Sequence, residues 1–310
     1  MSHKTAAVIL LAAVAAILML HLKPTSEQTS FEQWKVEHGK TYPSQFEEAY
    51  RKTVFLKNVA EVAVHNADKT NAYEKGINQF SDLTQDEFAA KYLTLKVKAQ
   101  VHSRTMQDSN INGDIDWVAA GKVTPVKNQA QCGSCWAFSA VAAIESGLLV
   151  AGQGATNLSE QQLVDCSRSY GNQGCNGGWM DSAFQYVRDK GLTTTQAYPY
   201  VARDQACAID SGSVKIKSFV DVPGCDNLWN ALSGRPVSVA VDASNWSSYK
   251  SGVFSTCGTA VNHGVLLVGA TDNYWVIKNS WATGWGENGF IRLARGNTCA
   301  ICGYPSYPTW

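Results

Sequence analysis

The residue best placed to do chemistry is Cys135, which lies between a glycine-bearing turn and a predicted helix that continues to about residue 149. The start of a helix presents unpaired N–H groups and the positive end of the helix dipole, and both favour a thiolate. Because the thiolate is the reactive form, this position predicts a nucleophile. Cys132 and Cys135 could instead be a redox or metal-binding pair. No His cluster at zinc spacing accompanies them, and the other C-x-x-C, Cys299 to Cys302, does not start a helix.

The segment Cys132-Gly133-Ser134-Cys135-Trp136 resembles the active-site signature of the papain-like cysteine peptidases. That family carries a histidine and an asparagine downstream of the cysteine. Here His263 follows Cys135 by about 130 residues and Asn279 follows it by about 145, in the same order. The resemblance covers nearly all of the chain beyond residue 30. It implies an α+β, papain-like fold of two lobes, one helical and one β-barrel-like, with a cleft between them.

The resemblance also implies roles in peptide hydrolysis, which needs a nucleophile, a proton carrier and a group that stabilises the oxyanion. Cys135 would be the nucleophile, and His263 would pair with it and later protonate the leaving amine. Asn279 would orient the imidazole. Gln129 would stabilise the oxyanion together with the backbone N–H of Cys135. Trp281 would cover the His263–Asn279 hydrogen bond and line the leaving-group side of the cleft.

Substrate-binding residues follow from the same resemblance. Gly177 and Gly178 would let an extended peptide approach the backbone closely, as strand addition requires. The S2 pocket, which receives the second residue before the scissile bond (P2), would be bounded by Trp179, Met180, Ala243, Asn262, Gly264 and Tyr304. None of these side chains is acidic, so we expect a hydrophobic or aromatic P2 residue. The bulk of Trp179 and Tyr304 is expected to narrow the pocket.

The nine cysteines indicate an oxidising compartment, and eight remain once Cys135 is set aside as the nucleophile. The pairing in the family implies three disulfides, Cys132–Cys175, Cys166–Cys207 and Cys257–Cys299. Cys225 and Cys302 are then left over, and we predict that they form a fourth.

The region from residue 25 to 95 is predicted to be a small helical domain without cysteine. Six residues recur at helical spacing along one side of a helix: Glu47, Arg51, Phe55, Asn58, Val62 and Asn66. An ordinary amphipathic helix would show the same spacing. The set also resembles the E-R-F-N-I-N pattern of cathepsin L-type propeptides. The G-N-F-D pattern of the same propeptides is matched by Gly76, Asn78, Phe80 and Asp82. This second resemblance implies a zymogen that its own propeptide inhibits.

Residues 1–24 are predicted to be a signal peptide, because their apolar run is short for a membrane span. A retained signal anchor is the alternative, since no clear cleavage site follows the run. Residues 96–110 are polar and lack apolar periodicity, which is typical of a linker open to proteolysis. The mature peptidase would then comprise residues 111–310, with a helical lobe over about 111–210 and a β-rich lobe over about 211–310.

Helical patterns come first in this part of the chain, at 136–149, at 160–165 after an N-cap at Ser159, and at 179–190 before Gly191. Strand patterns follow at 237–241, 264–269, 274–278 and 290–293. This order favours an α+β protein. Alanine stands where the family usually carries glycine at Ala130, Ala282 and Ala300. Where the backbone there has φ > 0, alanine costs on the order of 1 kcal/mol.

The composition is that of a globular protein, with 45% hydrophobic and 17% charged residues and zero formal charge, so nucleic acid is not an expected partner. We expect a monomer without metal or cofactor that cleaves peptides and proteins. Its location would be the secretory pathway, ending in a lysosome-like acidic vacuole or outside the cell.

Three other functions remain as alternatives. An exopeptidase of the same family would carry a long His-bearing insertion, and none lies between Cys175 and Cys207. A catalytically impaired relative that acts as a binding protein would lack Cys135, His263 or Asn279, and all three are present. A propeptide-like inhibitor would need only the first hundred residues.

Overall fold

The structure is a computed structural model that describes residues 30–97 and 113–310. The predicted signal peptide lies outside these residues, as does nearly all of the predicted linker. The chain forms two compact units, one ending at Lys52 and one running from Thr53 to Trp310, and each is described by itself. In the described part of the chain, no helix combines the length and the hydrophobicity needed to cross a membrane.

The first unit contains α2 (Phe31–Glu37) and the start of α3 (Gln45–Ala67). Helix α2 buries its two aromatic side chains, whose ring centroids lie 5.9 Å apart. On α3, Arg51 donates a hydrogen bond of 2.7 Å to Glu47, one turn earlier. These are the first two residues of the predicted propeptide pattern, and their spacing of four residues explains the pairing.

The second unit contains the rest of α3, the strand β1 (Tyr73–Lys75) and helix α4 (Gln85–Tyr92). Helix α4 begins with a capping box, in which Thr84 accepts a hydrogen bond from the backbone of Glu87 while the Glu87 side chain accepts one from the backbone of Thr84. This exchange satisfies donors that the first turn would otherwise leave unpaired.

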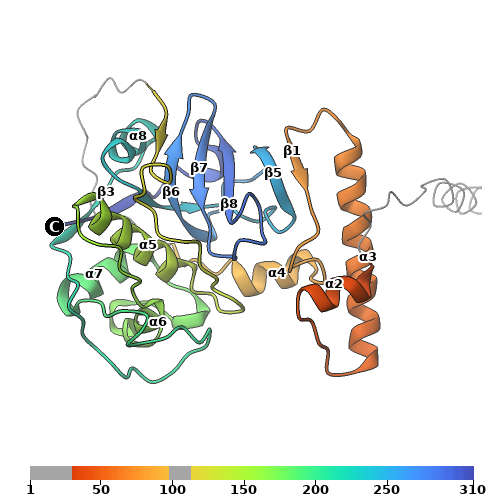
Figure 1. The fold of residues 1–310 in the computed structure, drawn as a ribbon, viewed down its shortest axis with the longest axis horizontal. Helices are drawn as coiled ribbons and strands as arrows, with labels where there is room; N and C mark the ends of the chain where they lie inside the picture. The colour runs from red at the N-terminus through yellow and green to blue at the C-terminus, as the bar shows by residue number, and fades with distance from the viewer. Residues whose placement is uncertain (1–29, 98–112) are drawn as a thin grey trace, which may run out of the picture. The chain divides into compact units, whose positions relative to one another are not determined.

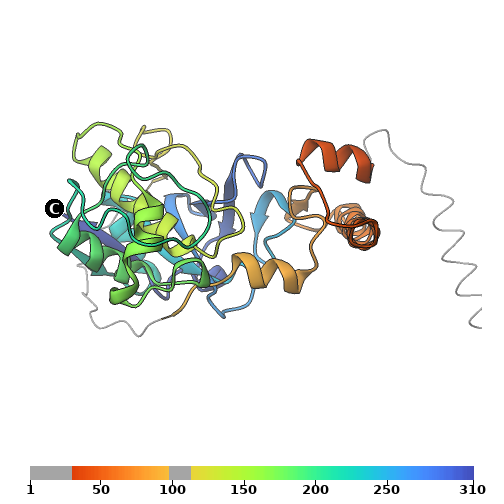
Figure 2. The same cartoon turned by 90° about the horizontal axis from the view of Figure 1, so that it is seen from below.

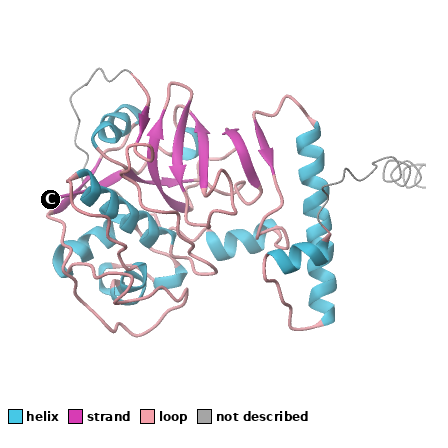
Figure 3. Ribbon diagram, viewed as in Figure 1, coloured by secondary structure: helices cyan, strands magenta, loops and turns pink. Residues whose placement is uncertain are grey.

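The helical lobe is built around α5 (Cys135–Val150), whose residues are buried from Cys135 to Leu148. Small residues on every side of α5 let its neighbours pack closely. These neighbours are α6 (Glu160–Cys166), η1 (Arg168–Tyr170), η2 (Gly174–Asn176) and α7 (Met180–Lys190). Figures 1 and 2 show them gathered with α5 on one side of the strands, and Figure 3 shows the same division between helix and strand. Ser159 caps α6 and Gly191, with φ of 80°, ends α7, as predicted.

The strands form one sheet in the order β1-β5-β8-β7-β6-β4-β9-β3, and β2 also pairs with β6. Their bounds are β2 (Ile115–Asp116), β3 (Ser218–Asp221), β4 (Val237–Val241), β5 (Tyr249–Phe254), β6 (His263–Ala270), β7 (Tyr274–Lys278), β8 (Phe290–Ala294) and β9 (Ser306–Thr309). A last 3-10 turn, η3 (Thr298–Ala300), precedes β9. Neighbours are antiparallel except β5 and β8. Among the described residues the path is open, because β1 and β3 at its two ends do not pair, so the lobe is not the barrel-like sheet expected.

Both faces of the central strands are covered, which is why β4 and β6 are apolar at nearly every position. Ala240 and Leu266 pack on the α5 side, whereas Val239 and Val265 pack toward α8 (Cys225–Gly234). The four predicted strands are β4, β6, β7 and β8. Helix α8 was missed, since the sequence beyond residue 214 was read as strands alone.

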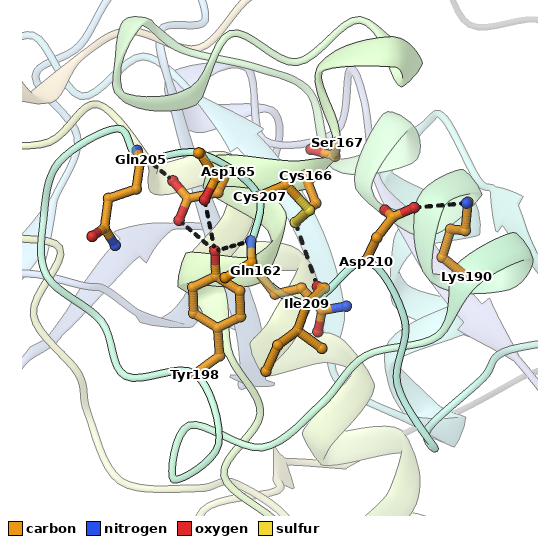
Figure 4. The surroundings of a disulfide bond; sticks show 12 residues. Gln162, Asp165, Cys166, Ser167, Lys190, Tyr198, Gln205, Cys207, Ile209 and Asp210 are labelled. Atoms are coloured by element: carbon orange, nitrogen blue, oxygen red, sulfur yellow. Dashed lines mark hydrogen bonds and ion pairs between the residues drawn. A yellow bond between two sulfur atoms is a disulfide. The ribbon is translucent and has the colours of Figure 1, made fainter.

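The structure contains four disulfides, and they are the four predicted pairs: Cys132–Cys175, Cys166–Cys207, Cys225–Cys302 and Cys257–Cys299. Cys135 is left as the free cysteine. Figure 4 shows the surroundings of Cys166–Cys207, where Tyr198 donates to Asp165 at 2.9 Å and Lys190 lies 2.7 Å from Asp210. Asp210 and the two sulfurs lie within 4.8 Å of one another. Because both sulfurs are joined in the disulfide, they are not thiolates able to bind a metal ion.

Candidate active site

Cys135 is the first residue of α5 and is fully buried. The turn before it is fixed by the disulfide Cys132–Cys175 and by a hydrogen bond of 2.9 Å from Gly133 N to Cys175 O. Gly133 has no room for a side chain, since a Cβ there would lie 2.3 Å from that same oxygen. The predicted turn-to-helix junction is therefore present, and it places the thiol at the N-terminus of a buried helix.

His263 and Asn279 come from neighbouring strands. His263 begins β6, Asn279 follows the last residue of β7, and these strands are antiparallel. The imidazole Nε2 lies 2.8 Å from Asn279 Oδ1, and the imidazole Nδ1 has no hydrogen-bond partner. The next residue, Gly264, packs against the start of α5, because a Cβ there would be 3.4 Å from the backbone oxygen of Cys135. The pairing of β6 with β7 thus brings His263 beside Asn279, and the packing of α5 on β6 brings Cys135 next to Gly264.

Trp281 and Gln129 are part of the same buried cluster. The Trp281 ring stacks on His263 with centroids 4.7 Å apart, and its Nε1 donates to Gln129 Oε1 at 3.2 Å. Ser280 Oγ donates to the same oxygen at 2.7 Å. Gln129 Nε2 donates to Cys132 O at 3.0 Å, which uses one of the two N–H bonds of the amide. The amide of Gln129 is therefore held beside the turn that precedes Cys135.

The alanines at 130 and 282 flank Gln129 and Trp281. Ala130 has φ of 49° and Ala282 has φ of 60°, so both adopt the left-handed conformation that favours glycine. Gln129 and Trp281 are nevertheless in hydrogen-bond contact. Ala300, at 61°, is in the same conformation. The departures from glycine thus cost conformational energy, and the hydrogen bond between Trp281 and Gln129 forms despite that cost.

The segment after α4 lies over the thiol as an extended chain. Leu95 N donates to Asn262 O at 3.1 Å and Lys96 N donates to Gly178 O at 3.0 Å. Gly177 also lies against this segment, since a Cβ there would be 2.0 Å from the backbone oxygen of Thr94. The glycine pair, predicted to contact substrate backbone, and Asn262, predicted to border the S2 pocket, thus both contact the backbone of this segment of the chain's own propeptide.

The predicted S2 residues are brought together in pairs. Trp179 and Tyr304 meet edge to face with ring centroids 5.5 Å apart. Met180 borders Gly264, where a Cβ would lie 3.1 Å from the Met180 sulfur and 3.4 Å from Leu95 Cδ1. The third pair is linked by a hydrogen bond of 2.9 Å, from Ala243 N to Asn262 Oδ1. The side chain of Leu95 thus lies beside this pocket.

The propeptide motif residues act mainly through hydrogen bonds to backbone. Asn58 donates to the carbonyls of residues 81 and 83, at 2.9 and 3.0 Å. Asn66 holds β1 by exchanging two bonds with Lys75, and Asn78 donates to Ser247 O at 2.8 Å. Phe55 and Asp82 are buried. Val62 lines a cavity beside α3, and Gly76 leaves space for Lys250.

Aromatic side chains hold the propeptide against the cleft. Phe80, Phe88 and Tyr92 surround the ring of Trp281 at centroid distances of 5.4, 5.2 and 6.4 Å. Such edge-to-face contacts stabilise by about 0.5–1.5 kcal/mol each beyond the area they bury. The residue expected to cover the His263–Asn279 bond is therefore also the platform on which the propeptide rests.

Burial shifts both Cys135 and His263 toward their neutral forms. It raises the pKa of Cys135 to about 11, against the opposite effect of nearby backbone N–H groups. It lowers the pKa of His263 to about 4, although the bond to Asn279 acts in the other direction. A charged form cannot be hydrated in this closed site and has no opposite charge beside it. The closed cleft therefore holds a thiol and a neutral imidazole.

Sequence reasoning missed a charge cluster behind the cleft, which comprises Lys127, Glu145, Glu160 and Lys278. Lys127 Nζ lies 2.7 Å from an oxygen of each glutamate. Thr124 donates to Glu145 at 2.5 Å and accepts from Lys278 at 3.1 Å. The cluster and Asn279 line the same cavity of about 20 Å³. The signal in the sequence was Glu145, a carboxylate in the middle of an otherwise apolar helix.

Comparisons with known proteins agree with this geometry. The model of the papain family of cysteine proteases matches residues 111–309, and that of the cathepsin propeptide inhibitor domain matches residues 31–88. Cathepsin L 2 of Paramecium tetraurelia is 45% identical over 90% of this chain and 91% of its own length. Digestive cysteine proteinase 3 of Homarus americanus is 40% identical over 96% and 99%.

Among solved structures, digestive procathepsin L 3 of the Tenebrio molitor larval midgut superposes with a TM-score of 0.84. It is 39% identical and covers 90% of this chain and 97% of its own. Both parts of the family architecture, the inhibitory propeptide and the protease, are thus matched in one chain. The chain therefore belongs to the papain family of cysteine proteases and is a cathepsin L-like zymogen.

Proposed function

We propose that the zymogen yields an endopeptidase in which Cys135, His263, Asn279 and Gln129 carry out catalysis. The observation that carries this proposal is the extended segment 94–96, which lies over the thiol and bonds to Gly178 and Asn262 as a substrate would. Removal of that segment admits water and substrate. The thiol proton can then pass to His263, because the charged pair gains solvation and mutual attraction.

In the proposed mechanism, the Cys135 sulfur attacks the substrate carbonyl carbon. Negative charge develops on the carbonyl oxygen, where the free N–H of Gln129 and the backbone N–H of Cys135 stabilise it. His263 donates its proton to the leaving amine, which departs and leaves a thioester. Water then attacks the thioester, His263 accepts a proton from that water, and the acid product leaves. Asn279, 2.8 Å from the imidazole, keeps the ring oriented throughout.

The position of Leu95 supports a hydrophobic or aromatic P2 preference. Its side chain is buried beside Met180 and Gly264, two of the proposed S2 residues. The edge-to-face pair of Trp179 and Tyr304 adds aromatic surface to this region. We infer that the pocket accepts an apolar side chain of about leucine size more readily than a charged one.

The proposal places residues 1–24 as a signal peptide or anchor, 25–95 as the inhibitory domain, 96–110 as the activation linker and 111–310 as the peptidase. The four disulfides support an oxidising environment, such as an acidic vacuole or the outside of the cell. The active form is proposed to be a monomer that acts on peptides and proteins.

The test uses full-length protein activated by acid and a peptide library in which cleavage positions are read directly. We expect internal cleavage after an apolar P2 residue, abolished by an epoxide inhibitor directed at active-site thiols. Cleavage only at peptide ends would indicate an exopeptidase. Cleavage that survives the inhibitor would exclude Cys135 as the nucleophile.

A further inference from the structure

Strand β5 has one partner that is permanent and one that is lost on activation. On one side it pairs with β8, which also belongs to the protease. On its other side lies β1 of the propeptide, with Tyr73 opposite Gly252 and Glu74 opposite Ser251. β1 is the last strand on that side of the sheet. Removal of the propeptide therefore turns β5 into an edge strand, whose backbone donors and acceptors become available.

The contacts with β1 show what this edge can bind. Val253 N donates to Ala72 O at 3.0 Å, and Gly76 N donates to Ser248 O at 2.8 Å. These bonds involve backbone atoms only and would serve any extended chain. The edge thus has the hydrogen-bonding pattern that proteins use to recognise peptides by strand addition.

Side-chain selectivity comes from an aromatic recess. Tyr73 is buried, and its ring centroid lies 4.7 Å from that of Phe254 and 6.4 Å from that of Tyr249. Phe254 and Tyr249 both remain with the protease after processing. The charged contact nearby, between Lys250 and Glu74 at 3.7 Å, is well exposed and contributes little. An aromatic side chain is therefore the feature that this edge selects.

We propose that in the activated enzyme the edge of β5 is a second peptide-binding site, which takes an extended segment of a protein substrate carrying an aromatic residue at the position of Tyr73. The proposal rests on the proposed function, because it adds a second contact to the same reaction. Tyr73 and Phe80 are seven residues apart, so the edge lies within about 25 Å of Phe80, whose ring centroid is 5.4 Å from that of Trp281 in the cleft. A long substrate can reach both places, whereas a short peptide cannot.

The structure supplies a matched pair of variants. Gly252 has φ of +97°, and a Cβ there would lie 2.6 Å from both Ala72 O and Tyr73 Cα, so Gly252→Ala blocks a docked strand. Gly296 has φ of +85° with nothing within 4 Å of a Cβ, so Gly296→Ala carries comparable backbone strain without that obstruction. Any effect of strain alone is therefore common to both variants.

The experiment compares hydrolysis of unfolded casein with hydrolysis of a short fluorogenic peptide by acid-activated full-length protein. We expect Gly252→Ala to lower the ratio of casein to peptide turnover by roughly tenfold, as loss of one of two linked contacts does. Gly296→Ala should keep the wild-type ratio. An unchanged ratio in Gly252→Ala, or an equal fall in both variants, would overturn the proposal.

A second measurement needs no variant. A synthetic peptide of residues 69–79, added to the wild-type enzyme, should inhibit casein cleavage and spare the short substrate, and its Tyr73→Ala version should inhibit less. Equal inhibition of both substrates would place the peptide in the cleft and overturn the proposal. If neither substrate were cleaved, the proposed function would fail by itself. Fluorescence anisotropy of the labelled peptide on the processed chain would then decide whether the edge binds it.

Discussion

The cleft and the charge cluster behind it are both buried, but their ionisable groups respond to burial differently. In the cleft, Cys135 and His263 have no opposite charge beside them, and burial moves both toward the neutral form. In the cluster, burial lowers the pKa of Lys127, but Glu160 and Glu145 at 2.7 Å outweigh it and the pKa is raised. A buried group therefore keeps its charge where an oppositely charged side chain lies beside it. Without such a partner, burial removes the solvation of the charged form and favours the neutral one.

This difference gives acid opposite effects on the two regions. His263 titrates near 4 in the closed zymogen and near 6.5 when unfolded, so the unfolded chain binds the proton first and stability falls by about 3 kcal/mol from pH 6.5 to pH 4. Burial raises the pKa of Glu160 to about 6 despite Lys127, so there the folded state binds the proton first. Stability from this group therefore increases as pH falls from about 6 to about 4.5. Through these two groups, acid therefore destabilises the closed cleft and stabilises the charge cluster.

The largest expected effect is that of Cys135→Ala, which removes the proposed nucleophile and no disulfide partner. Hydrolysis of a fluorogenic peptide should fall on the order of 10⁵-fold. The free energy of unfolding should change only slightly, because the thiol is uncharged in the closed state and its removal leaves no buried charge without a partner. Residual turnover within tenfold of wild type would contradict the assignment of Cys135.

Glu145→Ala should have the largest effect on stability. It removes one of the two carboxylates that neutralise Lys127 and takes the buried acceptor from the hydroxyl of Thr124 and the backbone N–H of Leu158, which together cost about 3–5 kcal/mol in the free energy of unfolding measured with urea. The matched control is Glu61→Ala, which removes an exposed i,i+4 pair with Lys57 at 3.8 Å and should cost less than about 0.5 kcal/mol. Similar losses in the two variants would show that burial of the pair is irrelevant.

The cleft could be predicted from the sequence far better than the cluster. Local spacing and a family signature indicated Cys135, His263 and Asn279, and strand periodicity indicated the elements that carry two of them. Lys127 and Glu160 gave no such local signal, because they meet Glu145 only when the loop before α5, α5 itself and α6 pack together. The open sheet and α8 were missed for a similar reason, since both depend on long-range contacts that no local pattern encodes.

The pH dependence of stability that His263 causes is a further test of the difference between the cleft and the charge cluster. In zymogen carrying Cys135→Ala, which removes the proposed nucleophile, stability should fall by about 3 kcal/mol as pH drops from 6.5 to 4. Adding His263→Gln, which keeps an amide opposite Asn279 and does not titrate, should reduce that fall. Urea unfolding at a series of pH values measures both. An unchanged pH dependence would mean that His263 is not the group that acid acts on.

Glu160→Gln should have the opposite and smaller effect. With the titrating group gone, the gain in stability between about pH 6 and pH 4.5, at most about 2 kcal/mol, should disappear. Asp86→Asn, on the first turn of α4, is a control that removes a carboxylate outside the cluster. The same urea series serves here. A larger gain in acid after Glu160→Gln would contradict the direction given for this glutamate.

The smallest expected effects concern the alanines at positive φ. Ala130→Gly and Ala282→Gly should each stabilise the protein by up to about 1 kcal/mol, because glycine adopts this conformation without steric cost. The greater conformational entropy of glycine in the unfolded chain reduces this gain. Ala300→Gly should give the same gain outside the residues assigned to catalysis, and so separates relief of strain from any effect on the cleft.

Thermal unfolding measures the stability of these three variants, and kcat/KM on the fluorogenic peptide measures their function. If only Ala130→Gly and Ala282→Gly lower kcat/KM, the strain around Gln129 and Trp281 helps to position them. If all three variants keep wild-type kcat/KM, the cleft tolerates that strain, and the hydrogen bonds of Gln129 to Ser280 and Trp281 are sufficient to hold it.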